Sequence, residues 1–335
     1  MNKELELWRF AAEKLKQNEP VTLLVVAESK GSSPGRQGFK MAVAGEELSG
    51  SIGGGVMEVR LVELAKGKRQ TNPKPEIPNP KSNKSQIPNL KSKMDLVHRK
   101  NSPDSSGMIC SGAQTVIFFE LKREHLKTVR QIVEALEDHL EKTLSISDSG
   151  FGIADLGTQR FDYRFSSEGE DDFLYQERLG FKSEIYIVGG GHCALALSEL
   201  MAKMDFYISL FDDREELNTL DKNRFVHRKT VISSYEKIAE FIPSGENVYV
   251  VVMTVGYKFD AIVIRKLFDK NFKYFGVLGS RAKMRVLLRE LEKDGFDQDR
   301  LKNIRTPIGL SINSRTPEEI AVSIAAEIIA VKNAG

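Results

Sequence analysis

The sequence predicts an α/β protein, in which a carboxyl-terminal Rossmann-like domain with a parallel sheet follows a smaller amino-terminal α+β domain. From residue 184 onward, apolar runs typical of strands alternate with helical patterns, which favours parallel strands with helices on both faces. The first of these strands leads into a glycine cluster and then a helix, as in nucleotide-binding βα units. The length of 335 residues is sufficient for two domains.

We expect the α+β domain over residues 1–155, a polar connection over 156–183 and the Rossmann-like domain over 184–335. Residues 67–107 stand apart, because they hold six of the eleven prolines and no phenylalanine, tyrosine or tryptophan. Such a segment buries too little apolar surface to offset the entropy of ordering, so we expect a disordered insert. It would be either a basic docking arm or a tolerated surface insertion.

Apolar periodicity defines the elements of the first domain. An amphipathic pattern near the amino terminus predicts a helix, and the uninterrupted apolar run VTLLVVA predicts a buried strand that ends at a glycine-rich turn. In chain order, the expected elements are a helix over 5–16, strands over 21–27 and 41–44, a helix over 58–66, a strand over 114–121 and a helix over 124–144.

The second domain is expected to have four strands, each followed by polar or helical sequence. Its last helix begins at Pro317, with Thr316 as the cap and Glu319 at the third position, which is a capping box. Isoleucines at helical spacing along that helix should pack on the sheet. The expected strands cover residues 185–188, 207–211, 248–253 and 274–278.

The segment GGGHCA at residues 189–194 matches the dinucleotide-binding pattern G-x-G-x-x-G/A after a strand. Asp212 ends the next strand, 21 residues after Gly191, where such folds place an acid that binds a ribose hydroxyl. Glycines let a phosphate approach the backbone, and the helix dipole favours the anion. We expect phosphate or nucleotide binding here; the alternative is a loop kept for packing alone. The residues concerned are Gly189, Gly191, His192, Ala194 and Asp212.

Three side chains near this loop leave alternatives open. Arg214 could accept a phosphate or pair with Asp213. His192 could face a ligand or simply be solvated at the start of the helix. Cys193 is expected to pack on the helix rather than to do chemistry.

Two further segments should reach the same edge of the sheet. Gly279, Ser280 and Arg281 follow the strand over 274–278 and begin a helix with a hydroxyl and a cation, which suits a second anion site. Thr254 lies at the end of the preceding strand. Ligands of open parallel sheets bind outside the carboxyl ends of the strands, so these residues and the glycine loop are expected to converge.

Two glycine-rich loops precede the insert, GSSPGRQG at residues 31–38 and GSIGGGVME at residues 50–58. Their glycines permit unusual backbone angles and close approach of a ligand, and an arginine could supply charge. The alternative is a pair of tight turns. The candidate binding residues are Arg36, Gly53, Gly54 and Gly55.

Cys110 lies between small residues just before the strand over 114–121. It is either a thiol presented in a cleft or an inert buried cysteine. The two cysteines and five histidines have no zinc-site spacing, and no P-loop or G-x-S-x-G motif occurs, so a metal hydrolase or P-loop protein is not expected.

Charge and hydropathy exclude further classes. The net charge of +2 combines +6 on the insert with −4 on the rest of the chain, so nucleic acid is not an expected partner. No run of about 18 apolar residues is present to span a membrane, and the amino terminus lacks a signal-peptide core. Two cysteines far apart fit the reducing cytoplasm, which is the expected location.

These segments, in this order, resemble the xanthine dehydrogenase accessory factor family (XdhC/CoxI). The motifs match both ends of the chain. In the first half they are GSSPGR at 31–36, GSIGGG at 50–55 followed by Glu58, and CSG at 110–112; in the second half they are GGGH at 189–192, FDDR at 211–214, LGSR at 278–281, PIGL at 307–310 and TPEEIA at 316–321.

The resemblance implies a molybdenum cofactor chaperone rather than an enzyme with turnover of its own. Such proteins bind the pterin-based cofactor, as molybdopterin or its dinucleotide form, and shield it. They support replacement of a terminal oxo ligand by sulfur together with a cysteine desulfurase. They then pass the cofactor to a molybdenum hydroxylase of the xanthine dehydrogenase type. The family also implies a homodimer.

The sequence departs from the family pattern at three places. Val56 stands where many members have a cysteine, the stretch TVGY at 254–257 lacks the histidine often found there, and CSG replaces a cysteine-glycine-glycine sequence at 110–112. The glycine loop and Asp212 also support a second hypothesis, an NAD(P)-dependent oxidoreductase, for which His192 is a weak candidate proton relay. A third hypothesis is a nucleotide-sensing module.

Overall fold

The structure is a computed structural model that describes residues 3–67, 93–97, 112–155, 161–168 and 172–334. Among the described residues, no helix is both long enough and apolar enough to cross a membrane.

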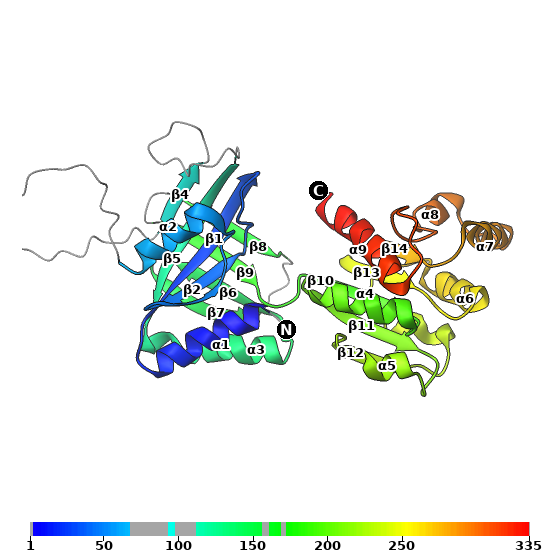
Figure 1. The fold of residues 1–335 in the computed structure, drawn as a ribbon, viewed down its shortest axis with the longest axis horizontal. Coiled ribbons are helices and arrows are strands. Elements are labelled where there is room, and N and C mark those ends of the chain that lie inside the picture. The colour runs from blue at the N-terminus through cyan, green and yellow to red at the C-terminus, as the bar shows by residue number, and fades with distance from the viewer. Residues whose placement is uncertain (1–2, 68–92, 98–111, 156–160, 169–171, 335) are drawn as a thin grey trace, which may run out of the picture. The chain divides into compact units, whose positions relative to one another are not determined.

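The chain forms two compact units, one over Asn2–Gly180 and one over Phe181–Gly335 (Figure 1). The amino-terminal unit contains, in chain order, α1 (Lys3–Lys16), β1 (Val21–Gly31), β2 (Lys40–Ala44), β3 (Glu47–Gly50), α2 (Gly55–Ala65), β4 (Lys93–Val97), β5 (Gly112–Leu121), η1 (Arg123–His125), α3 (Leu126–Glu137), β6 (Lys142–Ser147), β7 (Gly150–Asp155), β8 (Tyr163–Ser167) and β9 (Phe173–Arg178).

The strands of the amino-terminal unit form two antiparallel sheets. One has the order β3-β2-β1-β5-β4, and the other has the order β7-β6-β9-β8. The expected α+β domain is therefore confirmed.

Strand β1 lies at the centre of the five-stranded sheet and is buried on both faces, which explains its uninterrupted apolar sequence. Leu23 and Val25 point into a core that includes α1, α3 and the second sheet. Leu24 and Val26 point to the opposite face, where residues of α2 cover them. Alternation along one strand thus supplies two separate cores.

Two expectations for this part of the chain were wrong in extent. Residues 93–97 of the expected insert form β4, which pairs with β5; the two apolar side chains Met94 and Leu96 suffice to anchor an edge strand on the α2 face of the sheet. The helix expected over 124–144 ends at Glu137, because Asp138 caps it and β6 follows. The rest of the insert lies outside the described residues.

The expected connection over 156–183 is also different. It contains β8 and β9, which belong to the four-stranded sheet, so the amino-terminal unit extends to Gly180 and is not the smaller of the two in sequence. Phe173 and Tyr175 of β9 are buried in the core, and Leu174 between them faces outward. Such a strand has too few apolar residues to stand out from a polar linker in the sequence.

A buried ion network joins β9 to the rest of this unit. The Lys40 ammonium lies 2.7 Å from the Glu177 carboxylate and 3.1 Å from the Glu4 carboxylate. The Tyr175 hydroxyl donates a hydrogen bond of 2.9 Å to Glu177. Lys40 and Glu177 are almost fully buried, so each needs the other to offset the loss of hydration.

The carboxyl-terminal unit contains β10 (Ser183–Val188), α4 (His192–Ala202), β11 (Phe206–Asp212), α5 (Asn218–Lys222), β12 (Arg228–Val231), η2 (Tyr235–Glu240), β13 (Gly245–Val252), α6 (Tyr257–Leu267), β14 (Phe272–Val277), α7 (Arg281–Lys293), α8 (Gln298–Lys302) and α9 (Pro317–Asn333).

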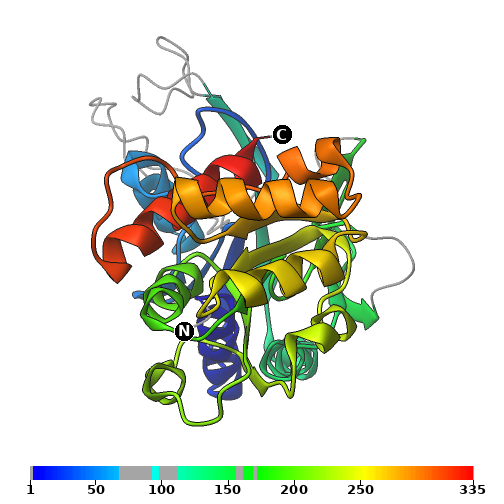
Figure 2. The same ribbon diagram turned by 90° about the vertical axis from the view of Figure 1, so that its right-hand side faces the viewer.

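The five strands of this unit form one parallel sheet with the order β12-β11-β10-β13-β14. Helices α4 and α9 cover one face, and η2, α6 and α7 cover the other (Figures 1 and 2). This is the Rossmann-like architecture that the alternation of strands and helices predicts.

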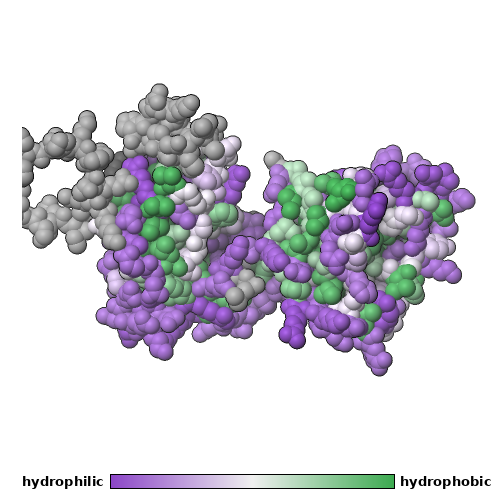
Figure 3. Space-filling model, in the orientation of Figure 1, coloured by the Kyte–Doolittle hydropathy of each residue, from purple (hydrophilic) through white to green (hydrophobic). Residues whose placement is uncertain are grey.

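The capping box of α9 forms as expected. The Thr316 hydroxyl accepts a hydrogen bond from the Glu319 amide, and the Glu319 carboxylate accepts one from the Thr316 amide, both at 3.2 Å. Ile324 and Ile328 are buried against the sheet. Other apolar side chains stay on the surface of α9 and the segment before it, where Figure 3 shows hydrophobic residues. They are Leu310, Ile312, Val322 and Ile329.

Replacement of Lys40 by methionine tests the buried ion network. We expect Lys40→Met to lower the free energy of unfolding by about 3 kcal/mol, because Glu177 stays buried without its cation. Lys30→Met is the matched control: Lys30 pairs with Glu28 at the surface, and such pairs contribute less than about 1 kcal/mol. Guanidinium denaturation followed by circular dichroism measures both; equal midpoints for the two variants would contradict the assignment.

Candidate functional site

The topology of the carboxyl-terminal unit brings its predicted segments to one edge of the sheet. Strands β10, β13 and β14 are neighbours, so the loops that follow them start side by side. A β-carbon added at Gly189 would lie 2.3 Å from the Met253 carbonyl oxygen and 2.9 Å from the Thr254 nitrogen. Leu278 donates a backbone hydrogen bond to Val252. We call this edge, with residues 189–192, 212–214, 254–256 and 279–281, the rim.

Asp212 is fully buried at the end of β11, beside the glycine loop that follows β10. One carboxylate oxygen accepts hydrogen bonds from the Gly190 amide at 2.6 Å and from the Arg214 guanidinium at 2.8 Å. The other accepts from the Arg214 amide at 2.9 Å and from its guanidinium at 2.8 Å. Burial would raise the pKa of Asp212, but these hydrogen bonds outweigh it and hold the pKa below its usual range. The carboxylate has no acceptor position left for a ribose hydroxyl.

Arg214 therefore pairs with Asp212 rather than with Asp213. The Asp213 carboxylate instead accepts a hydrogen bond of 3.2 Å from the Tyr235 hydroxyl. The Arg214 side chain is about 39% exposed, so the edge of the guanidinium that does not face Asp212 is open to solvent. An arginine held in this way presents the rest of its donors with little loss of conformational freedom.

Two glycines of the first rim loop have different roles. Gly189 has a φ of 107° and touches the next loop, so the fold itself requires glycine. Gly191 caps α4 with an ordinary φ of −69°, and a β-carbon there would meet nothing within 4 Å. The space beside Gly191 is open and borders the first amides of α4, where a phosphate would be stabilised.

The next three positions are divided between surface and core. His192 is exposed as the first residue of α4, whereas Ala194 is buried against the sheet and does not face the rim. Cys193 is half-buried and packs against the same core. Burial, with a smaller contribution from Glu318, raises the pKa of its thiol, which fits packing rather than thiolate chemistry.

Thr254 is held by a carboxylate that the sequence motifs did not indicate. Its hydroxyl donates a hydrogen bond of 2.6 Å to Asp260, and its amide donates one of 3.2 Å to the same oxygen. Asp260 is 1% exposed, and burial raises its pKa. The sequence signal that could have identified Asp260 is its position as an acid on the apolar face of α6, beside Ala261 and Ile264. Gly256, which caps α6, has open space at its β-carbon position, as Gly191 has.

The third rim segment is built as a helix cap. The Ser280 hydroxyl accepts a hydrogen bond of 3.3 Å from the Lys283 amide and so caps α7. Arg281, the first residue of α7, is exposed. A β-carbon at Gly279 would lie 2.5 Å from the Met284 side chain. Ser280 therefore has a structural role, and Arg281 is the exposed cation of this segment.

The predicted loops of the amino-terminal unit also come together. A β-carbon at Gly35 would lie 2.2 Å from the Ile52 carbonyl oxygen, and one at Gly53 would lie 2.4 Å from the Gly35 nitrogen. A β-carbon at Gly112 would lie 2.5 Å from the Ser33 nitrogen. These glycines allow three backbone segments to pack directly on one another. Cys110 lies outside the described residues.

Glu58 organises the second of these loops. Its carboxylate accepts hydrogen bonds from the Ser51 hydroxyl at 2.6 Å, the Ile52 amide at 2.8 Å and the Gly54 amide at 2.9 Å. Burial would raise the pKa of Glu58, but these bonds outweigh it and lower the pKa. Positive φ angles of 125°, 75° and 72° allow the loop to wrap around the carboxylate. They belong to Gly53, Gly54 and Gly55.

Arg36 is exposed, and its guanidinium donates a hydrogen bond of 3.2 Å to the Gly31 carbonyl oxygen. It therefore lies over the first loop, where its remaining donors face solvent. Within the described part of the chain, no group of three or more histidine, cysteine, aspartate or glutamate side chains could hold a metal ion.

Replacement of Glu58 by glutamine tests the loop. We expect Glu58→Gln to lower the free energy of unfolding by about 1 kcal/mol at pH 7, because the amide accepts fewer hydrogen bonds at a partly solvated site. Since the folded state lowers this pKa, the stabilisation is full above about pH 5 and is lost as the pH falls through the folded pKa. Urea denaturation between pH 7 and pH 3, with Glu63→Gln as control, measures this; a difference independent of pH would refute it.

Comparisons with known proteins identify the two units separately. The sequence model for the XdhC Rossmann domain matches residues 185–328, and that for the XdhC and CoxI family matches residues 14–73. The two matches fall in different units and together span more than half of the chain.

Two curated proteins are similar in sequence to this chain. The chain is 22% identical over 331 residues to the uncharacterized protein YqeB of Escherichia coli strain K12, covering 98% of this chain and 47% of YqeB. It is 29% identical over 158 residues to a probable xanthine dehydrogenase subunit from Bacillus subtilis strain 168, covering 47% of this chain and 45% of that protein. The chain thus spans about half the length of the curated relatives it matches.

A solved structure shares the whole fold. The crystal structure of a xanthine dehydrogenase from Bacillus halodurans, at 2.80 Å resolution, superposes with a TM-score of 0.67 at 19% identity, covering 99% of this chain and 96% of that chain. At this identity the likeness establishes the fold alone. The family matches, each lying in the unit where the corresponding motifs are found, show that the chain belongs to the XdhC and CoxI family.

Proposed function

We propose that this protein is a xanthine dehydrogenase accessory factor that binds molybdenum cofactor, supports its sulfuration and delivers it to a molybdenum hydroxylase of the xanthine dehydrogenase type. Family membership supports the role of accessory factor. We further propose that it acts in the cytoplasm as a homodimer and that a cysteine desulfurase supplies the sulfur. The cofactor is cargo, and it provides the molybdenum centre that the client enzyme needs.

The observation that carries this proposal is the open space at Gly191. The fold itself does not require glycine there, yet any larger residue would fill the space in front of the first amides of α4. We propose that a phosphate group of the pterin cofactor occupies that space, where the backbone amides would bind it. Gly256 leaves similar space at the start of α6.

The side chains around the rim would then have distinct roles. Arg214, fixed by Asp212, offers its exposed edge to a phosphate. Arg281 adds a second exposed cation, and Thr254 is held in place by Asp260. His192 borders the phosphate position at the start of α4. In this proposal the rim binds and orients an anionic ligand.

In the amino-terminal unit, we propose that Arg36 and the loop over 53–55 contact the cofactor. The glycines of this loop keep its backbone bare of side chains, and Glu58 keeps its shape. Cys110 is the proposed thiol ligand for the molybdenum-sulfur group, because thiolates suit soft metal chemistry.

Replacement of Gly191 by valine tests the rim. A side chain at Gly191 enters open space, so we expect Gly191→Val to fold normally but to reduce the bound cofactor at least tenfold by blocking the phosphate position. Gly152→Val is the matched control, because Gly152 also has no neighbour within 4 Å of its β-carbon position. Both variants are purified from cells that make molybdenum cofactor, and molybdenum and pterin are assayed.

Wild-type protein without molybdenum or pterin, combined with unchanged xanthine dehydrogenase activity after deletion of the gene, would overturn the proposed function. If the Gly191→Val variant retains its cofactor in full, only the proposal that the cofactor binds at the rim is overturned.

Titration with nicotinamide dinucleotides tests the oxidoreductase hypothesis. The acceptor positions of Asp212 are filled by Gly190 and Arg214, so we expect dissociation constants for NAD(H) and NADP(H) of about 1 mM or weaker. Isothermal titration calorimetry measures them. Micromolar binding accompanied by a substrate-dependent change in absorbance at the nicotinamide band would favour the oxidoreductase instead.

A further inference from the structure

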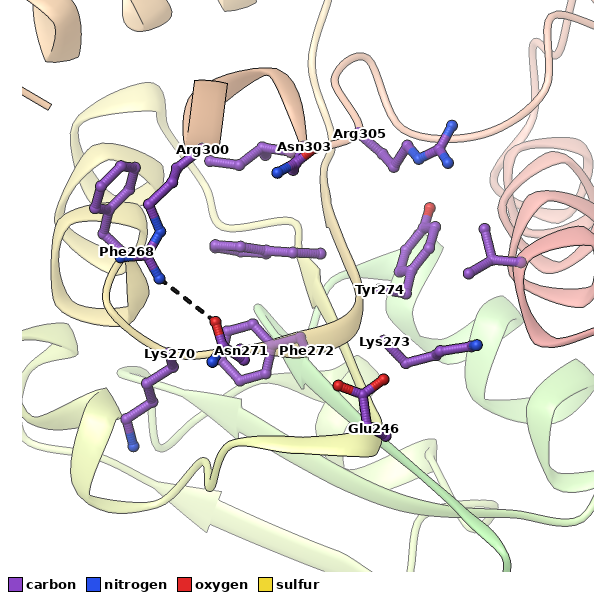
Figure 4. A pocket seen from close by; sticks show the side chains of 13 residues that line it. Glu246, Phe268, Lys270, Asn271, Phe272, Lys273, Tyr274, Arg300, Asn303 and Arg305 are labelled. Carbon is purple, nitrogen blue, oxygen red and sulfur yellow. Dashed lines mark hydrogen bonds between the residues drawn. The ribbon is translucent and has the colours of Figure 1, made fainter. Parts of the chain in front are cut away.

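A pocket lies in the carboxyl-terminal unit, at the edge of the sheet opposite the rim. It opens at the amino ends of β13 and β14 and has a volume of about 440 Å³ (Figure 4). Glu246 of β13, the turn over 270–273 before β14, and residues 300–305 at and after α8 line it. The volume is within the range of pockets that hold small ligands.

Four cations but only one carboxylate line this pocket. Two of the cations are engaged. The Lys270 ammonium donates hydrogen bonds to the carbonyl oxygens of Ala239 and Ile242. The Arg300 guanidinium is 3.5 Å from both the Asp269 carboxylate and the Asn271 side-chain oxygen, and it lies over the ring of Phe268.

The other two cations, Lys273 and Arg305, have no carboxylate partner among the described residues. Glu246, the one acid of the lining, forms no ion pair with them in the described part of the chain. Glu327 lies behind Tyr274, where its carboxylate accepts hydrogen bonds from the Tyr274 hydroxyl at 2.6 Å and the Gly309 amide at 2.9 Å and keeps its negative charge. The side chains that line the pocket thus carry four positive charges and one negative charge.

Arg305 is also fixed in position. Its amide donates a hydrogen bond of 2.8 Å to the Phe275 carbonyl oxygen, and its own carbonyl accepts one of 2.9 Å from the Val277 amide. These bonds attach the residue to β14 as an isolated parallel bridge. The backbone of Arg305 is therefore held at a defined place beside the pocket, and little backbone entropy is lost when its exposed side chain binds a ligand.

Aromatic side chains provide the apolar part of the lining. Phe272 and Phe275 are half-buried, and their rings lie edge to face with centres 5.5 Å apart. Tyr274, which stands between them in the sequence, is buried. Figure 4 shows Phe272 and Tyr274 on the strand side of the pocket and Arg300 and Arg305 across from them. These rings give a mainly polar and charged lining one apolar surface, against which a ring of a ligand could lie.

We propose that this pocket binds a phosphate-bearing ligand of nucleotide size, whose phosphates contact Lys273 and Arg305 and whose ring lies against the aromatic wall. Guanidinium and ammonium groups without internal partners are the groups that bind phosphate in proteins. The pocket is separate from the rim, so this site is additional to the proposed cofactor site.

The test uses ADP as the probe and the full chain with Gly191→Val, which removes phosphate binding at the rim. Calorimetry should give one site for ADP, and hydrogen exchange should show protection in peptides covering 268–275 and 300–305. Each of Lys273→Gln and Arg305→Gln should weaken ADP binding about tenfold, the effect of one charge-assisted hydrogen bond. Arg289→Gln, which removes an exposed cation of α7 outside the pocket, should leave it unchanged.

Adenosine, which lacks phosphate, should bind at least 100-fold more weakly than ADP. The proposal is overturned if ADP does not bind, if the two pocket variants bind it as tightly as the parent, or if adenosine binds equally well. Protection confined to residues 189–195 would likewise overturn it. None of these outcomes depends on molybdenum or pterin content, so the cofactor proposal stands or falls separately.

Discussion

The arrangement of the rim depends on the hydrogen bonds of one buried carboxylate, Asp212. It binds the amide of the glycine loop on one side and the guanidinium of Arg214 on the other, across the ends of β10 and β11. Because a buried carboxylate without partners is very costly, both neighbours are held in place. The acid that a dinucleotide enzyme would use to bind ribose is thus used here to shape the loop and to fix a cation. That difference favours an anion-binding protein over a nicotinamide enzyme.

In the amino-terminal unit, a carboxylate also fixes a glycine-rich loop. Glu58 collects the backbone amides of a glycine loop, and close contacts at Gly35, Gly53 and Gly112 join that loop to two others. In both units a carboxylate with a lowered pKa keeps a glycine-rich backbone in a conformation that it would not hold alone.

Much of this could be predicted from the sequence, because it follows from local patterns. Strand β1, four of the five parallel strands and the cap of α9 each follow from the spacing of apolar residues or from a short capping sequence, whereas the polar edge strand β12 has no such spacing. Strands β8 and β9 could not be predicted, since their polar faces resemble a linker and only the second sheet orders them. The pairing of Arg214 with Asp212 and the burial of Asp260 depend on side-chain geometry. The basic pocket joins residues spread between positions 246 and 331, which no local pattern connects.

The central claim is that the rim holds the cofactor through the first amides of α4. Hydrogen exchange of the full chain, measured with and without molybdenum cofactor under anaerobic conditions, tests it most directly. We predict slower exchange for the amides of residues 190–195 and 254–258 when the cofactor is bound. Unchanged exchange in both segments, with the cofactor demonstrably bound, would contradict the account.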